Sequence, residues 1–171
     1  MDAPERPDGQ YLGFQLAGEE YAFSILRVRE LISYGVVTHV PSMPPWIKGV
    51  INLRGSVVPV VDLAMKFGLP PVEVTARTCI VIVDALLGGA QTLMGVLAEA
   101  VSRVFELKPD DIQPPPSFGT RVRAGCLVGM AKSDLKFVLL LDADKALAAE
   151  DPFDVMTPAE TAPAERAAAE R

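Results

Sequence analysis

The chain has few residues of the kinds that perform catalysis, and their spacing does not bring them together. His39 is the only histidine, and it ends an apolar run with no cysteine nearby. A metal site, a Cys/His or Ser/His relay, or phosphotransfer through His39 would need partners from distant parts of the chain. A surface or strand-end histidine is the simpler interpretation, because His39 precedes Pro41 on β-branched flanks and not on an exposed helix.

Glycine and acidic motifs also lack a catalytic context. Gly88, Gly89 and Gly95 form neither a GxGxxG fingerprint nor a phosphate-binding loop. The pair Asp110–Asp111 is typical of a helix start, and the pair Glu19–Glu20 falls in an expected hairpin turn. These patterns predict a protein that is not an enzyme and has no cofactor.

The two cysteines are predicted to be free thiols. Cys79 lies in an apolar strand and Cys126 follows much later beside Gly125, without CxxC spacing. This spacing disfavours both a disulfide and a metal site, and it fits a reducing cytoplasm.

A cationic turn carries the clearest potential for binding. The segment Trp46–Leu63, WIKGVINLRGSVVPVVDL, contains two β-prone apolar runs separated by the polar turn Asn52–Gly55. The pattern predicts strand, tight turn, strand, with Gly55 supplying a permissive backbone angle. Arg54 then lies on the turn and offers a planar fork of donors to a carboxylate on another surface. The alternative is a solvated turn arginine with a loose surface partner.

Short strands punctuated by glycine and proline must position this turn. They indicate a barrel or sandwich and not a βαβ sheet. The expected elements are a first hairpin turning at 18–20, a β-branched run at 36–40, strands at 79–83 and within 92–104, a turn at 86–90, and a last hairpin from 127–130 and 137–141. Asp62 and Asp142 are predicted to cap short helices, the second over Ala143–Ala149. Leu26–Leu31 fits either a helical turn or a strand start.

Composition and charge bound the class of protein. The 171 residues are 50% hydrophobic with a mean hydropathy of +0.28, enough for one domain or two small packed halves. The net charge is -6, but residues 10–149 carry 13 acidic and 13 basic side chains, so the acidity lies at the ends. With no basic stripe, we expect neither nucleic-acid binding nor an electrostatic membrane anchor.

The ends of the chain are predicted to lie outside the folded body. Residues 1–9 are acidic and proline-rich where a secretory signal would be basic and then apolar, and no apolar run is long enough to cross a bilayer. Residues 150–171 form an acidic Ala/Pro/Glu tail with little to bury. We therefore expect a flexible N-terminus (1–9), a folded body (10–149) and a disordered tail (150–171) in a cytoplasmic protein without direct membrane insertion.

An ordered series of segments from Gln10 to Ala148 resembles the CheW family, the adaptors that couple bacterial chemoreceptors to the histidine kinase CheA. The segments are YLGFQLAGEEYAFSI, LRVREL, VPSMPPWIKGVINLRG, VVPVVDLAMKFG, TCIVIV, MGVLAEAVSRV and KFVLLLDADKAL. Two features depart from the family pattern: DALLGGAQ is a few residues longer than usual, and the acidic tail is long. The chain has about the length of a stand-alone adaptor.

The resemblance implies an all-β fold with short helices. Its two SH3-like five-stranded barrels would pack around a shared hydrophobic core. One internal echo is compatible with two similar halves, since Arg27–Leu31 and Arg103–Leu107 both read RVxEL. Chance can also produce so short a match.

The resemblance further implies partners and a receptor-binding surface. The partners are the cytoplasmic signalling tip of a chemoreceptor and the regulatory domain of a CheA-type kinase, with self-association in arrays also allowed. The candidate receptor-binding residues are Val28, Glu30, Gly49, Asn52, Arg54, Cys79 and Val101. No kinase-binding residues are assigned.

Each candidate also has a structural explanation. Val28, Cys79 and Val101 are core residues by default, and Gly49 serves either strand entry or the close approach of a partner backbone. Glu30 either pairs with Arg54 or is separated from it by the barrel wall. Trp46 either anchors a partner or covers the core.

Two other functions fit parts of the sequence. An adaptor in a chemosensory-like pathway with an output other than motility shares every residue argument. A small β-barrel enzyme or ligand-binding protein is more remote, because no polar triad is evident.

Overall fold

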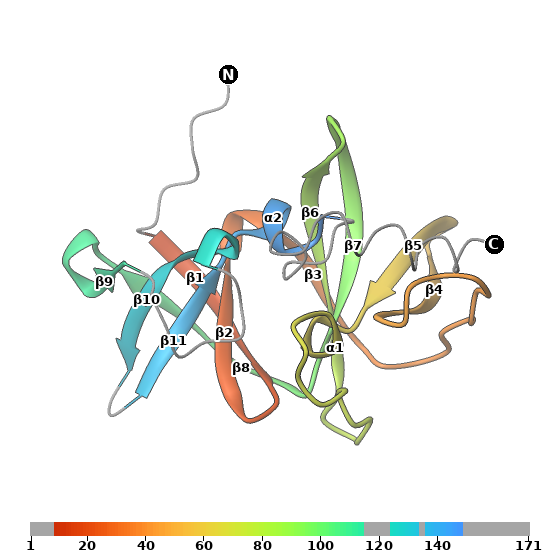
Figure 1. The fold of residues 1–171 in the computed structure, drawn as a ribbon, viewed down its shortest axis with the longest axis horizontal. Coiled ribbons are helices and arrows are strands. Elements are labelled where there is room, and N and C mark those ends of the chain that lie inside the picture. Colours follow the sequence, from red (N-terminus) through yellow and green to blue (C-terminus); the bar gives the residue numbers. More distant parts are fainter. Residues whose placement is uncertain (1–8, 115–123, 134–135, 149–171) are drawn as a thin grey trace, which may run out of the picture.

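The computed structural model describes residues 9–114, 124–133 and 136–148, which fold into two β-sheets (Figure 1). The first sheet has the order β8-β1-β2-β11-β10-β9 and the second has the order β3-β6-β7-β5-β4. We call them the first and second barrels. The first contains β1 (Gly9–Leu16), β2 (Glu19–Ser24), β8 (Ala100–Leu107), β9 (Ile112–Gln113), β10 (Leu127–Ser133) and β11 (Lys136–Leu141). The second contains β3 (Val28–Ser33), β4 (Ile47–Leu53), β5 (Ser56–Val61), β6 (Cys79–Leu87) and β7 (Ala90–Ala98).

The two barrels have the same pattern of strand pairing. In each, the second strand of one hairpin pairs in parallel with the second strand of another, β2 with β11 and β7 with β5. A short helix follows each of these partner strands, α1 (Leu63–Lys66) after β5 and α2 (Ala143–Ala146) after β11. The side chains of Asp62 and Asp142 cap them by accepting a backbone N–H. The two RVxEL motifs end on β3 and β8, which occupy corresponding positions in the two sheets. Strand β3 pairs with β6, the first strand of the hairpin β6–β7, and β8 pairs with β1, the first strand of the hairpin β1–β2.

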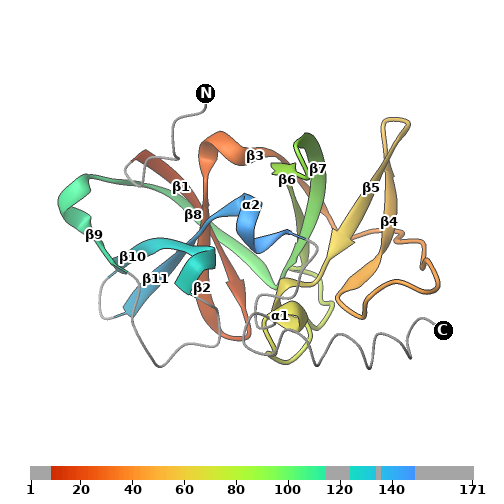
Figure 2. The same ribbon diagram turned by 45° about the horizontal axis from the view of Figure 1, so that its top comes forward.

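The chain enters the second barrel from the first and then returns. Strands β1 and β2 come first, β3 to β7 build the second barrel, and β8 to β11 complete the first, as the colours in Figures 1 and 2 show. The second barrel is therefore one continuous piece of sequence, residues 28–98, and it is inserted between two separate pieces that form the first barrel.

The predicted fold class is confirmed, with local differences. β1 begins at Gly9, inside the segment expected to be a flexible N-terminus, and the first sheet gains the two-residue strand β9. Residues 26–31 were expected to form either a helical turn or the start of a strand, and they contain both: a 3-10 turn over Ile25–Arg27 is followed by β3. The run at 36–40 forms only a bridge at Thr38, because proline follows it, and α2 ends at Ala146. The expectations for residues 1–8 and 150–171 lie outside the described residues.

One hydrophobic cluster spans both barrels, as predicted. Phe14 and Phe23 of the first barrel stack with centroids 5.2 Å apart, and Tyr21 meets Phe67 of the α1 segment at 6.3 Å. Burial, together with the charge of Glu19, raises the pKa of Tyr21 to about 12, so its phenol stays neutral in this core. Members from the second barrel include Val58, Val60, Ile80, Val81, Ile82, Val83, Val96 and Leu97.

A polar junction joins α2 to the second barrel. Nη1 and Nη2 of Arg27 donate to the two carboxylate oxygens of Asp144 at 2.8 and 2.9 Å, and Nη1 also donates to the carbonyl of Asp84 at 2.9 Å. The Leu86 N–H donates to Oδ1 of Asp144 at 2.6 Å. Because α2 follows the first barrel and Leu86 lies on β6, this junction fixes one barrel on the other.

Within the described residues, no helix combines the length and the apolar composition needed to cross a bilayer.

Replacement of Val81 by Asp should unfold both barrels together. Val81 is fully buried in the shared cluster, so an uncompensated carboxylate there should cost more than about 3 kcal/mol. The matched control Val57→Asp, at a position that is 73% exposed, should change stability by about 1 kcal/mol. Urea unfolding followed by Trp46 fluorescence and by circular dichroism should give one coincident transition for the unmodified chain. Two resolved transitions would contradict the shared core.

Asp144→Asn should destabilise the protein in a pH-dependent way. Partial burial acts to raise the pKa of Asp144, but hydrogen bonds from Arg27 and the Leu86 N–H, with the Arg27 charge, lower it below its usual value. A carboxyl with a lowered pKa stabilises the fold above its unfolded-state pKa and loses this contribution as pH falls through its folded-state pKa. We expect a loss of about 1–2 kcal/mol at pH 7 that shrinks below about pH 4. Urea titrations from pH 7 to 3 measure it, and a constant difference would contradict it.

Candidate functional site

The second barrel closes where the chain after β3 meets β4. The Thr38 N–H donates to the Val50 carbonyl, and the Val50 N–H donates to the Thr38 carbonyl, both at 2.9 Å. Gly49 lies beside this closure with φ +150°, and a Cβ there would stand 2.2 Å from the Thr38 carbonyl oxygen. Gly49 permits the close approach of a backbone, but this backbone is that of Thr38 in the same chain and not that of a partner.

The hairpin turn after β4 matches the sequence prediction. Leu53 pairs with Ser56, so Arg54 and Gly55 form a two-residue turn, and their φ angles of +50° and +89° are both left-handed. The side chain of Asn52 accepts the Gly55 N–H at 2.8 Å. An arginine in this conformation costs about 1 kcal/mol or more, a cost that glycine would avoid.

Arg54, on the turn after β4, forms an ion pair with Glu30 on β3. Nη2 of Arg54 lies 2.5 Å from Oε1 of Glu30, and the two side chains are 69% and 30% exposed. The alternative that the wall separates these residues is therefore wrong. An exposed pair adds little stability, but it orients the guanidinium at the surface.

A groove opens between the closure and the ion pair. We call it the β3–β4 groove; its volume is about 350 Å³, and it is lined by Ile32, Ser33, Gly35, Val36, Thr38, Ile51, Asn52 and Ile80. Ile32 lies two residues beyond Glu30 on β3, and Asn52 lies two residues before Arg54. The ion pair thus stands at one end of the groove and the Thr38–Val50 closure at the other.

The other candidate residues occupy different places. Val28 is half-buried on β3, with a bulge in the β3–β6 pairing between it and Glu30. Cys79 opens β6, is half-buried and pairs with Ser33. Val101 is half-buried on β8 of the first barrel, opposite Phe14. Glu30, Asn52 and Arg54 are thus the candidates gathered around the groove.

The exposed apolar side chains near the groove were not predicted from the sequence. Val36 is 88% exposed and lines the groove, and Val57 is 73% exposed and pairs with Asn52 across the hairpin. Leu31, on β3, is 44% exposed. No sequence signal marks them: the strand register decides which face of Leu31 and Val57 is outward, and Val36 lies in the coil between β3 and β4.

The described residues offer this groove no catalytic apparatus. No group of three or more His, Cys, Asp or Glu side chains among them is placed to hold a metal ion. His39 is exposed, whereas Cys126 is buried and its Sγ donates to the Lys145 carbonyl at 3.8 Å. What the groove presents is an oriented cation beside exposed aliphatic side chains, which suits recognition of a protein surface. Two interleaved small barrels with such a surface define a protein-binding module.

Comparison with known proteins gives this module its family. The model of the CheW-like domain matches residues 10–151, so the chain belongs to the CheW family. It is 34% identical to the chemotaxis protein CheW of Klebsiella aerogenes over 149 residues, covering 87% of each chain. It is 28% identical to the protein FrzA of Myxococcus xanthus, covering 86% of this chain and 90% of that one.

A solved structure of a related protein supports this family assignment. The scaffolding protein TtCheW of Thermoanaerobacter tengcongensis superimposes with a TM-score of 0.73 at 29% identity, covering 85% of this chain and 92% of the other. The chain is therefore a non-catalytic adaptor that couples chemoreceptors to a CheA-type kinase in chemotaxis, as predicted from the sequence. The small β-barrel enzyme considered from the sequence is excluded by this membership.

Gly49→Ala should open the barrel closure. The new Cβ would clash with the Thr38 carbonyl and would occupy a backbone conformation that alanine rarely adopts. We expect a loss of about 2–4 kcal/mol in unfolding free energy. Gly35→Ala is the matched control, since a Cβ there comes no closer than 4.0 Å to the Ser33 carbonyl. Equal stability of the two variants in thermal unfolding would show that Gly49 has no closing role.

Proposed function

We propose that the β3–β4 groove and the Arg54 turn receive the signalling tip of a chemoreceptor. The observation that carries this proposal is the conformation of Arg54. Its backbone φ is in the left-handed region, its side chain is largely exposed, and Glu30 nevertheless orients its guanidinium. Backbone strain at an exposed side chain contributes nothing to the core, so it points to a role at the surface.

The charge of Arg54 supplies one part of the recognition. A guanidinium has five N–H donors, and Glu30 accepts from Nη2 alone, which leaves donors for a receptor carboxylate. Because the ion pair already restricts the arginine, binding costs less side-chain entropy. Asn52 adds an exposed amide, although its oxygen already accepts the Gly55 N–H.

The aliphatic side chains supply the other part. Val36 and Val57 offer exposed apolar surface beside Asn52, and an amphipathic helix of a receptor coiled coil would cover them. Val28 and Cys79 then extend this contact along β3 and the start of β6. Val101 belongs to it only if the receptor also reaches the first barrel, and Gly49 acts indirectly by closing the barrel.

Surfaces other than the β3–β4 groove are available to bind the kinase. We propose that they bind the regulatory domain of a CheA-type kinase, and that this adaptor works in the cytoplasm at receptor arrays, where copies can also associate with one another. Holding receptor and kinase on one rigid body raises their effective concentration. Receptor states that bind the groove differently would then be transmitted to the kinase.

Arg54→Glu should weaken receptor binding at least tenfold without unfolding the protein, because it reverses a charge at the contact. The measurement is titration of a receptor signalling-tip fragment, with thermal unfolding alongside. Kinase-domain binding should be nearly unchanged. A fall in melting temperature of many degrees with unchanged receptor affinity would contradict the assignment.

Two variants separate the receptor contact from the internal ion pair. The exchange Glu30→Arg with Arg54→Glu re-forms an ion pair but leaves the wrong charge on the turn, so stability should be kept while receptor binding stays weak. Lys108→Glu makes the same change in charge on an exposed side chain in the segment between β8 and β9. Strand β9 lies at the opposite end of the molecule from β4 and β5 (Figure 1). This variant should bind the receptor normally. Full recovery of binding in the exchanged variant would show that Arg54 acts only through Glu30.

A further inference from the structure

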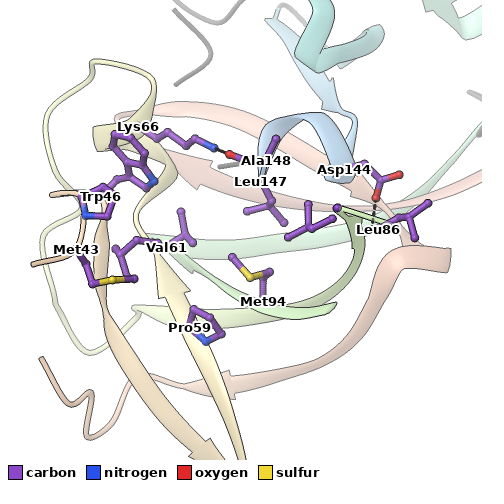
Figure 3. A pocket seen from close by; sticks show the side chains of 14 residues that line it. Met43, Trp46, Pro59, Val61, Lys66, Leu86, Met94, Asp144, Leu147 and Ala148 are labelled. Atoms are coloured by element: carbon purple, nitrogen blue, oxygen red, sulfur yellow. Dashed lines mark hydrogen bonds between the residues drawn. The ribbon is translucent and has the colours of Figure 1, made fainter. Parts of the chain in front are cut away.

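A second cavity lies on the other side of the second barrel, away from the residues of the β3–β4 groove. Its volume is about 570 Å³, and strands β5 to β7, the loop before β4 and α2 enclose it (Figure 3). It is lined by Met43, Pro44, Trp46, Ile47, Pro59, Val61, Lys66, Leu86, Leu87, Gly88, Met94, Asp144, Leu147 and Ala148. We call it the α2 pocket.

The α2 pocket leaves apolar surface in contact with water. Met43 and Leu86 are 46% and 43% exposed, and Pro59 and Met94 point into the space between them and α2 (Figure 3). Its charged members already have partners, since Asp144 holds Arg27 and Lys66 donates to backbone carbonyls. An apolar segment is therefore the complementary occupant.

The last described residues of the chain lie on the edge of this pocket. Nζ of the buried Lys66 donates to the Ala146 carbonyl at 2.9 Å and to the Ala148 carbonyl, and it lies 5.6 Å from the centre of the Trp46 ring. Lys66 thereby fixes both the C-terminal end of α2 and the point at which residues 149–171 begin. Any apolar side chain soon after Ala148 is tethered beside the pocket.

The sequence after Ala148 contains one such cluster. In AEDPFDVMTPAETAPAERAAAER, the only apolar side chains larger than alanine and proline are Phe153, Val155 and Met156. Five residue steps separate Phe153 from Ala148, a reach of roughly 17 Å when extended. In an extended segment Phe153 and Val155 share one face, while Asp154 and Met156 lie on the opposite one.

We propose that the segment Phe153–Met156 docks into the α2 pocket of its own chain. The short tether gives the segment a high effective concentration, about millimolar, so modest apolar contacts suffice. A docked segment covers Met43 and Leu86, and a protein that uses this face must first displace it. The acidic remainder of the tail stays outside the pocket, because its carboxylates have no counterpart there.

Trp46 reports occupancy directly, since it is the only tryptophan and lines the pocket. The full chain should be compared with a variant carrying Phe153→Ala, Val155→Ala and Met156→Ala. Loss of docking should shift the Trp46 emission to longer wavelength and increase its quenching by acrylamide. A control carrying Thr157→Ala, Glu160→Ala and Thr161→Ala changes the same tail outside the cluster and should leave both readings unchanged.

A second experiment tests the docking in trans. A chain that ends at Ala148 should show the exposed Trp46 signal, and a synthetic peptide of residues 149–160 should restore the covered signal saturably, whereas the same peptide with the three alanines should not. Unchanged Trp46 emission and quenching in the cluster variant would overturn the proposal. So would a covered signal in the full chain that is lost on dilution, because the occupant would then be a second copy.

Discussion

The shared hydrophobic core is the constraint on which the rest of the structure depends. Each barrel is too small to bury a sufficient apolar surface alone, so Phe14, Phe23 and Tyr21 of the first barrel pack in one cluster with Val60, Ile82 and their neighbours in the second. The second barrel, β3 to β7, is inserted between β2 and β8 of the first, and α2, which follows the last strand of the first barrel, packs against β6 of the second. We therefore expect the two barrels to unfold together.

The rigidity that follows suits the docking role proposed for this small surface. The second barrel closes only because Gly49 admits the Thr38 carbonyl, and this closure sets one end of the β3–β4 groove. At the other end, Arg54 accepts an unfavourable backbone conformation and is held by Glu30. A guanidinium fixed on a rigid frame can distinguish partner states that a freely rotating lysine would not.

The two cavities of the second barrel have different origins. The β3–β4 groove lies between the two edge strands of the second sheet, β3 and β4, which are joined only through the bridge between Thr38 and Val50. The α2 pocket lies where the second barrel meets α2, and its edge is set by contacts of Lys66 and Asp144 between parts of the chain far apart in sequence. One scaffold thus presents both a polar and aliphatic groove and an almost wholly apolar pocket.

The sequence by itself determined the elements and the class of fold. The Arg54–Gly55 turn, the Asp62 and Asp142 caps and the short apolar strands follow from local preferences, which act over a few residues. Only the tertiary structure decided that Glu30 meets Arg54, that the backbone approaching Gly49 is Thr38, and that Val36 and Val57 face outward while Val101 packs against the core. These outcomes depend on strand register and on pairing between distant segments, which shift by whole residues without any change in local preference.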